Sequence, residues 1–354
     1  MMWQMIGQDR AVSLLQRSLE MGALAHAYLF VGPAHVGKMT LAIKLAKALN
    51  CTAAEPPCGE CLSCQKIASN KHADVQVIDL DHRGDLTEAE SRVKIGVGQI
   101  EQVQHSASLP PFEGRYKVFI IDRADLLSIG AANRLLKTLE EPEDNTVFVL
   151  LTTSEQLLPL TVISRCQRVE LYPVAINELE EILKSNWVSD PAKARLLTRL
   201  SRGCPGWALA AIHDERLLGQ RDEYLDEIMS IAHADYDERF TYAGRLAAQF
   251  QQNRELVQER LGLWLGWWRD LLLVKAGSAD DITNIDRLDT LVEMAGGYSL
   301  TQTRDFINSI RAAYQQLGQN ANAQLVLEVL MLDLPVVGDR GGGRYAAQIE
   351  VKHG

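Results

Sequence analysis

Features of several large protein classes are missing from this chain of 354 residues. No uninterrupted apolar stretch reaches about 18 residues, so the sequence predicts no membrane-spanning helix. The first residues lack a basic stretch followed by a long apolar one, and we therefore expect no export signal. An excess of basic residues is missing too, because the net charge is −10. Coating nucleic acid alone requires such an excess, so we expect DNA contact only as one member of an assembly.

Cysteine is scarce, with six residues in the chain, and four of them lie between positions 51 and 64. This clustering suits metal binding in a reducing cytoplasm better than a disulfide framework, so we expect a cytoplasmic protein. The spacing is C-x6-C-x2-C-x2-C, formed by Cys51, Cys58, Cys61 and Cys64. Four thiolates complete a tetrahedral Zn²⁺ site with no open position for water, which is typical of a structural site.

Two alternatives to zinc remain for these four cysteines. An iron–sulfur run would continue with a further cysteine three residues on, where this chain has Ala68. Free thiols are the other alternative. Cys166 and Cys204 are far from the cluster in the sequence, and we expect them to be core residues.

The first half of the chain alternates between strand and helix signals, which predicts a parallel sheet covered by helices on both faces. The expected strands are at 27–31, 74–80, 117–122, 146–153 and 167–171. The expected helices among them are at 10–22, 38–50, 99–105 and 128–141.

Strand signals largely end after Pro173, and the length of the chain suggests two to three domains. Residues 176–213 have the pattern of a small group of helices, and residues 217–333 are helical throughout. In this last region, Trp264, Trp267 and Trp268 share a helix with several leucines. We interpret that helix as a buried element of an all-α domain.

Residues 32–40 nearly match the phosphate-binding pattern G-x-x-x-x-G-K-[ST]. Gly32, Gly37 and Lys38 are in register, between a predicted strand and a predicted helix, as the motif requires. The hydroxyl that holds Mg²⁺ is missing, because Met39 follows the lysine and a thioether is a poor ligand for a hard cation. Thr40 is one residue late, and on a helix it points about 100° away from the required direction.

Asp122 ends the predicted strand at 117–122, downstream of this loop. An acid there can support Mg²⁺ in a phosphate-loop protein, and a turn or capping acid is the alternative. The next residue is Arg123, a permanent cation that cannot accept a proton from an attacking water.

Several segments together resemble the bacterial clamp loader of DNA polymerase III, a family of AAA+ proteins. They are Gly7-Gln8, residues 25–30, the four-cysteine insertion, residues 132–142, Thr152-Thr153 and Ser164-Arg165-Cys166. The resemblance extends over residues 1–215 with specific motifs, and over the remaining helices only in general character.

This resemblance implies a fold and a domain order. We expect an AAA+ P-loop domain at 1–173, which contains the zinc module at about 51–64. A small helical lid at 174–215 would come next. An all-α collar domain at 216–335 and a flexible tail at 336–354 would follow.

Three departures from the family pattern indicate which kind of subunit this is. The motor subunits, gamma and tau, would have Thr or Ser at position 39, Glu at position 123 and Arg near position 206. This chain has Met39, Arg123 and Gly206. The resemblance therefore points to the non-hydrolysing member of the family, a subunit of the DNA polymerase III holoenzyme without ATPase activity of its own.

The family resemblance also assigns a role to Arg165, although an arginine in a loop is by itself usually a solvated surface charge. It implies an arginine finger that acts in trans on ATP held by a neighbouring subunit, with Ser164 and Cys166 shaping the loop. The implied partners are the gamma/tau and delta subunits, with the sliding clamp and primed DNA reached through the complex. No membrane partner is expected.

Two other functions remain open at this point. One is an active gamma/tau-like ATPase, in which Thr40 or water replaces the missing Mg²⁺ ligand. The other is a free-standing nucleotide sensor. Gly32, Gly37, Lys38, Thr40 and Asp122 would form a degenerate ATP site, or the loop is kept empty for packing.

Overall fold

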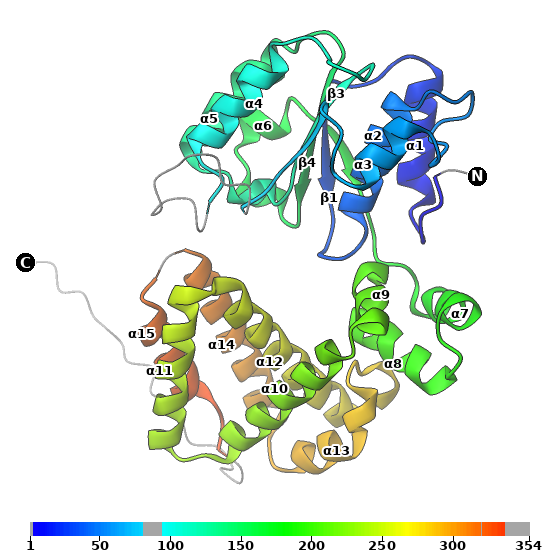
Figure 1. Cartoon of the computed structure of the whole chain (residues 1–354). Coiled ribbons are helices and arrows are strands. Elements are labelled where there is room, and N and C mark those ends of the chain that lie inside the picture. Colours follow the sequence, from blue (N-terminus) through cyan, green and yellow to red (C-terminus); the bar gives the residue numbers. More distant parts are fainter. Residues whose placement is uncertain (1–2, 81–93, 320, 337–354) are drawn as a thin grey trace, which may run out of the picture. The chain divides into compact units, whose positions relative to one another are not determined.

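Figure 1 shows a computed structural model of the chain, which describes residues 3–80, 94–319 and 321–336. It divides into an N-terminal unit, Met1–Asn186 with Ser201–Leu209, and a C-terminal unit, Trp187–Leu200 with Ala210–Gly354. The expected flexible tail lies outside the described residues except for Val336. Within the described part of the chain, no helix has the length and apolar character needed to cross a membrane.

A five-stranded parallel sheet in the order β2-β3-β4-β1-β5 forms the centre of the N-terminal unit. The strands are β1 (Ala27–Val31), β2 (Val75–Ile78), β3 (Lys117–Ile121), β4 (Thr146–Thr152) and β5 (Gln167–Glu170). The helices are α1 (Asp9–Glu20), α2 (Lys38–Asn50), α3 (Leu62–Ala68), α4 (Val97–Ala107), α5 (Ile129–Glu140), α6 (Leu160–Ile163) and α7 (Ile176–Asn186). Short 3-10 segments lie at Ala124–Leu126 and Glu155–Leu157.

Both faces of the sheet are covered by helices. Successive side chains along each strand point to opposite faces, so each strand contributes to two apolar clusters. Tyr28 and Phe30 of β1 belong to the cluster that α1 and α2 complete. Leu29, between them, belongs to the cluster that α4 and α5 complete on the other face. In Figure 1 these two helix pairs lie on opposite sides of the sheet. The predicted α/β fold, with helices on both faces, is thus confirmed.

The strand at 27–31 and the helix at 38–50 have the bounds predicted from the sequence. Two helices of this unit were not predicted. Helix α6 is only one turn long, too short for a periodic apolar pattern to be recognised. Helix α3 begins at a cysteine, because the Cys61 Sγ accepts the backbone N–H of Cys64 and caps the helix.

The C-terminal unit is helical. Its helices are α8 (Pro191–Ser201), part of α9 (Pro205–His213), α10 (Arg216–His233), α11 (Tyr236–Gln252), α12 (Arg254–Lys275), α13 (Leu288–Gly296), α14 (Leu300–Gly318) and α15 (Ala323–Asp333). Short 3-10 segments lie at Ala279–Asp281 and Ile285–Arg287.

The core of the C-terminal unit is built around α12. Trp264, Trp267 and Trp268 are each at most 1% exposed, which confirms their predicted burial. The Trp268 ring lies 4.7 Å from the Phe306 ring of α14 and 5.0 Å from the Tyr298 ring, measured between centroids. Such aromatic contacts add to the large apolar area that each ring buries.

Replacing Trp268 with alanine should lower the free energy of unfolding of the C-terminal unit by about 3–5 kcal/mol, because it leaves a cavity in this core. The control is Trp187→Ala in the same unit, where the side chain is 43% exposed and should cost less than about 1 kcal/mol. Urea unfolding followed by far-UV circular dichroism measures both. Equal losses in the two variants would contradict this description of the core.

Candidate nucleotide site, arginine loop and metal centre

The carboxyl ends of β1, β3 and β4 meet at one edge of the sheet because the strands are parallel. The loop at 32–37 follows β1, Asp122 follows β3, and Thr152 is the last residue of β4. Thr152 lies beside Val31 in the register of β1 and β4, and its carbonyl accepts the Gly32 N–H at 3.2 Å. The topology therefore brings the predicted phosphate loop and the predicted acid to the same edge.

Lys38 is turned back onto its own loop. Its Nζ donates to the carbonyl oxygens of Gly32 at 2.7 Å and Pro33 at 2.8 Å, and the residue is 9% exposed. Burial lowers the pKa of Lys38 below its usual value, although the carboxylates of Asp122 and Asp125 oppose that shift. The ammonium group thus satisfies the carbonyls of this loop instead of projecting from it.

Met39, Thr40 and Asp122 lie at or near the place where the motif would hold Mg²⁺. The Met39 side chain is partly buried and packs against the apolar cluster on the α1 and α2 face of the sheet, whereas Thr40 is exposed. Asp122 Oδ1 accepts the backbone N–H of Arg123 at 3.0 Å, and Arg123 has a left-handed backbone with φ of 50°. No hydroxyl follows Lys38 to complete a metal site at this edge.

Sequence reasoning gave no role to Asp125, a further polar residue at this edge. Asp125, in the 3-10 segment after β3, accepts the Thr152 hydroxyl at 2.7 Å. That hydroxyl in turn accepts the Ser154 N–H at 3.0 Å, so the end of β4 is tied to the segment after β3. The sequence contained a signal for this pair, since Asp125 is a second acid three residues after a strand-end acid.

Gly206 contacts the phosphate loop directly. Its backbone N–H donates to the His35 carbonyl at 2.9 Å. A β-carbon at position 206 would lie 2.7 Å from that same oxygen, closer than such atoms approach in proteins. His35 itself has a left-handed backbone with φ of 61°. The first turn of α9 can therefore close on the loop only because residue 206 has no side chain.

Arg165 lies at the other edge of the sheet. It follows α6 and precedes β5, so it stands where the parallel strands begin, whereas the phosphate loop stands where they end. Strand β5 is four residues long, and each residue of a strand adds about 3.3 Å, so the separation is roughly 13 Å along that strand alone. Arg165 and Lys38 are thus not brought together within this chain.

The Ser164-Arg165-Cys166 loop has contacts that define its shape. Ser164 Oγ lies 3.2 Å from the Thr161 carbonyl, and the Arg165 N–H donates to the Val162 carbonyl at 3.1 Å. The Cys166 side chain packs toward the core on the α4 and α5 face, as predicted, and burial raises its pKa to about 12. The Arg165 guanidinium forms an ion pair with Glu140, with Nη2 and Oε1 2.6 Å apart.

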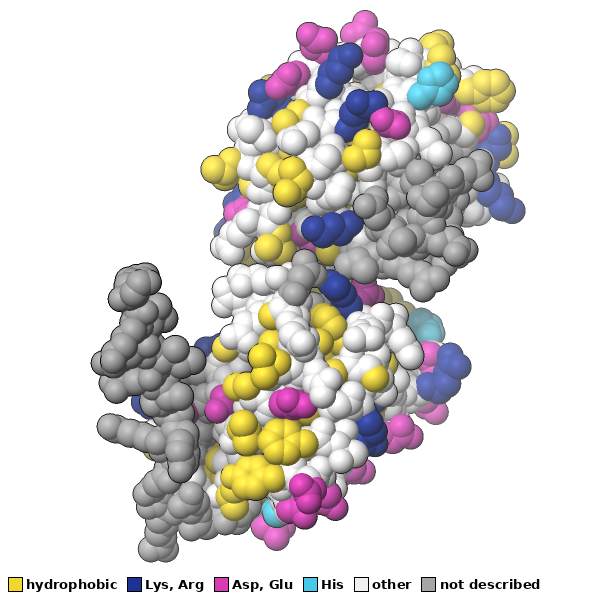
Figure 2. Space-filling model, turned by 90° about the vertical axis from the view of Figure 1, so that its left-hand side faces the viewer, with side chains coloured by type: hydrophobic (Ala, Val, Ile, Leu, Met, Phe, Trp, Pro, Cys, Tyr) yellow, Lys and Arg dark blue, Asp and Glu magenta, His cyan; other side chains and the backbone are white. Residues whose placement is uncertain are grey.

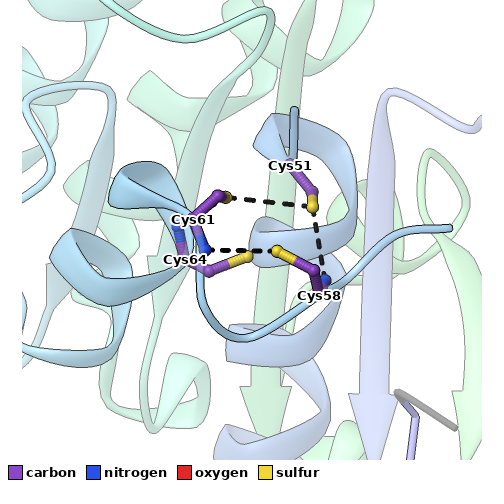
Figure 3. Close-up of side chains that lie close together, drawn as sticks. All are labelled: Cys51, Cys58, Cys61 and Cys64. Atoms are coloured by element: carbon purple, nitrogen blue, oxygen red, sulfur yellow. Dashed lines mark hydrogen bonds between the residues drawn. The ribbon is translucent and has the colours of Figure 1, made fainter. Parts of the chain in front are cut away.

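The four predicted ligand cysteines come together as Figure 3 shows. Their sulfur atoms all lie within 4.8 Å of one another, and the sulfurs of Cys51 and Cys61 are 3.9 Å apart. A tetrahedral ion with metal–sulfur bonds of about 2.3 Å requires sulfurs separated by about 3.8 Å. The cluster therefore has the dimensions of a four-thiolate metal site, which could hold an ion such as zinc.

Backbone N–H groups around this cluster favour thiolates. The Cys51 sulfur accepts the N–H groups of Ala53 and Cys58, and the Cys58 sulfur accepts that of Cys61. Hydrogen bonding, led by the backbone of Thr52, lowers the pKa of Cys61 to about 6, whereas burial raises the pKa of Cys64 to about 12. A cation at the centre would supply the charge that stabilises a thiolate at the buried position.

The cysteine module is fastened to the loop that leads into β3. Lys66 on α3 forms an ion pair with Glu113 of that loop. The Asn50 side chain, at the end of α2, accepts the N–H groups of Arg115 at 2.8 Å and Tyr116 at 3.0 Å. An ordered module at this place therefore stabilises the entry of β3, the strand that Asp122 follows.

These features define a P-loop α/β protein of the AAA+ class, with a helical C-terminal unit. A family model described as DNA polymerase III, delta subunit, matches residues 7–175. A second, for the C-terminal part of the DNA polymerase III delta subunit, matches residues 220–335. The chain belongs to the clamp-loader family of DNA polymerase III subunits, which confirms the resemblance drawn from its motifs.

Individual relatives agree with this assignment. The delta-prime subunit of DNA polymerase III from Bacillus subtilis is 29% identical over 334 residues, which cover 92% of this chain and 96% of that protein. The tau subunit of the same organism is 41% identical over 167 residues, covering 47% of this chain and 28% of tau. The Escherichia coli tau subunit is 36% identical over 207 residues, covering 56% of this chain and 30% of tau. The chain thus spans less than a third of each tau relative.

Solved structures that align with this chain include a gamma subunit-related protein of DNA polymerase III from Thermotoga maritima. It has a TM-score of 0.44 and 17% identity, and the alignment covers 92% of this chain and 98% of that chain. The RuvB Holliday junction branch migration motor of the same organism has a TM-score of 0.42 and 21% identity, with 91% and 87% covered.

Replacing Gly206 with alanine should lower the free energy of unfolding by about 1–3 kcal/mol, because the added carbon collides with the His35 carbonyl. The matched control is Gly219→Ala inside α10, where an added β-carbon meets nothing within 4 Å. That change should raise stability by about 0.5–1 kcal/mol through helix propensity. Opposite signs in urea unfolding are expected, and a stabilising Gly206→Ala would refute the close contact.

Proposed function

We propose that this chain is a delta-prime-type subunit of a clamp loader, which hydrolyses no ATP itself and lends Arg165 to a neighbouring motor subunit. The observation that carries the proposal is the position of Arg165 at the edge of the sheet opposite the phosphate loop. A guanidinium placed there cannot serve the loop of its own chain. A phosphate that it does serve must therefore come from another molecule.

The chain's own phosphate loop supports the non-hydrolysing part of the proposal. Met39 offers no oxygen to Mg²⁺, and Arg123 offers no base for an attacking water. Lys38 donates to carbonyls of the loop, so a nucleotide would have to break two short hydrogen bonds to recruit it. The Mg²⁺ ligand and the base needed for hydrolysis are thus missing from this site, and its lysine is already engaged by the loop.

The chemistry proposed for Arg165 is electrostatic. Negative charge develops on the phosphoryl group during transfer, and a guanidinium has donors in a fixed geometry that matches phosphate oxygens. An arginine finger of this kind contributes about 10³–10⁵-fold to the rate at the site that it reaches. Ser164 and Cys166 would hold the loop in shape, as their contacts suggest.

We propose gamma/tau and delta subunits as the partners of this chain, with the sliding clamp and primed DNA engaged through the complex. Alignment with a delta-prime relative over nearly its whole length, and with tau over less than a third of tau, supports this assignment. We further propose that residues 174–215 act as the lid and residues 216–335 as the collar. The Gly206 contact with the phosphate loop is compatible with a lid role.

An apolar surface supports a collar contact. Figure 2 shows apolar side chains on the face of the C-terminal unit where α11 and α15 pack together. They include the partly stacked rings of Tyr236 and Phe240 on α11, and Leu325, Val329 and Leu332 on α15. Leu325, Val329 and Leu332 recur at helical spacing and are each about half exposed or more, which suits a further helix packed against them.

We also propose that the metal is Zn²⁺ and that its role is structural. Four thiolates leave no coordination position for water, and the cluster lies beside α3, away from the phosphate loop in the sequence. The ion would hold α3 in place, and with it the Lys66–Glu113 ion pair that fastens the loop before β3.

The purified chain should contain one equivalent of zinc, measured by plasma mass spectrometry, and Cys61→Ser should lose most of it and melt at a lower temperature. Cys204→Ser is the control, because Cys204 is buried outside the cluster and its loss should leave the zinc content unchanged. Iron with a visible absorption band would support the iron–sulfur alternative. Stable chain without any metal would support free thiols.

Arg165→Ala should leave folding and assembly intact and slow ATP hydrolysis by the complex reconstituted with gamma/tau and delta. The rate at the site facing Arg165 should fall by about 10³–10⁵-fold. The total rate of the complex should fall by the fraction of ATP hydrolysis that this site normally contributes. Arg168→Ala is the matched control, because Arg168 is an exposed arginine three residues on that pairs with Glu155 and Glu170.

Three results would contradict the proposal. An unchanged rate for Arg165→Ala would remove the finger assignment. Turnover by the isolated chain that is lost in Lys38→Ala would favour the active ATPase. Nucleotide binding by a chain that stays monomeric among the other subunits would favour the sensor.

A further inference from the structure

The Arg165 side chain is folded back toward its own unit. Its Nη1 donates to the Thr161 carbonyl at 2.9 Å, one turn earlier on α6, and approaches Ser164 Oγ at 3.4 Å. Its Nη2 pairs with Glu140 Oε1 at 2.6 Å. Glu140 is the last residue of α5, which packs against α6 (Figure 1). Both terminal nitrogens of the guanidinium are thus engaged within the chain.

Glu140 stands where an acid is locally unfavourable. The carboxyl end of a helix carries a partial negative charge, so an acidic side chain there is repelled and a basic one is attracted. Glu140 ends α5, and Arg165 is the cation that compensates it. The charge of the helix end disfavours this carboxylate, and the pair with Arg165 offsets that repulsion.

We propose that Glu140 is a positioning residue that keeps Arg165 retracted until a phosphate of a neighbouring subunit replaces its carboxylate. This inference rests on the proposed role of Arg165 as an arginine finger. A carboxylate and a phosphate are both anions that bind guanidinium through paired N–H groups, so they compete for the same nitrogens. Glu140 therefore shifts the finger toward the retracted position where no phosphate is presented to it, and a presented phosphate shifts it toward engagement.

The pair is weak enough to be displaced. The side chains of Arg165 and Glu140 are 34% and 50% exposed, so solvent screens their attraction. Exposed ion pairs of this kind alter an equilibrium by about two- to fivefold, equivalent to about 0.4–1 kcal/mol. A neighbouring triphosphate carries more negative charge than one carboxylate and can outcompete it. Glu140 would thus tune the engagement of the finger without preventing it.

The test uses the complex reconstituted with gamma/tau and delta subunits, and compares ATP hydrolysis at subsaturating and saturating ATP. Glu140→Gln should raise the rate of ATP hydrolysis at subsaturating ATP about two- to fivefold, with a smaller change at saturation. The reason is that the carboxylate that competes with the phosphate for Arg165 is gone. The gain should shrink as salt is added, since salt also weakens the native pair. Glu141→Gln is the matched control, because it removes the same charge one residue on from an exposed side chain.

The double variant Glu140→Gln with Arg165→Ala separates positioning from a merely structural effect. The gain from Glu140→Gln should vanish when Arg165 is absent, because Glu140 acts only through that side chain. An unchanged or lower rate for Glu140→Gln, with Arg165→Ala still slow, would overturn the retraction and leave the finger standing. A rate that Arg165→Ala leaves unchanged would overturn the finger itself, and the role of Glu140 with it.

Discussion

The common direction of the five strands is the constraint on which the functional geometry depends. All connections between parallel strands must cross the sheet, so every loop that follows a strand lies at one edge and every loop that precedes one lies at the other. The phosphate loop, Asp122 and Thr152 are of the first kind, and Arg165 is of the second. One chain thereby carries half of a nucleotide site at one edge and a separate cation at the opposite edge. The proposed arginine finger uses this separation, because a cation at that edge can serve only the nucleotide of another subunit.

The phosphate loop has structural contacts of its own in this chain. Its glycines still provide the turn, and Lys38 still lies at the start of α2, but the ammonium binds Gly32 and Pro33 within the loop. Gly206 then closes on His35 from the first turn of α9. These contacts give a physical reason to keep the glycines and the lysine in a loop without a magnesium ligand. The motif therefore identifies the fold more securely than it identifies an activity.

A second structural theme is the bracing of β3. The cysteine module, Asn50 and the Lys66–Glu113 pair all hold the segment that leads into this strand, and Asp122 follows the strand. The four-cysteine site is thus connected through these contacts to the segment that enters β3. The proposed role as a non-hydrolysing subunit requires such rigidity, because the contacts of such a subunit must keep their positions while neighbouring subunits change.

The sequence by itself determined the elements whose signals are local. The strand at 27–31, the helix at 38–50, the buried tryptophans of α12 and the four-cysteine spacing could be predicted because neighbouring residues set periodicity, burial and ligand spacing. Only the tertiary structure decided that Gly206 touches His35, that Asp125 holds Thr152, and that Glu140 binds Arg165. These pairs are far apart in the chain and join polar or glycine residues, which leave no periodic pattern. These contacts depend on how the connections between parallel strands bring distant segments together. No single segment of the sequence carries a signal for that arrangement.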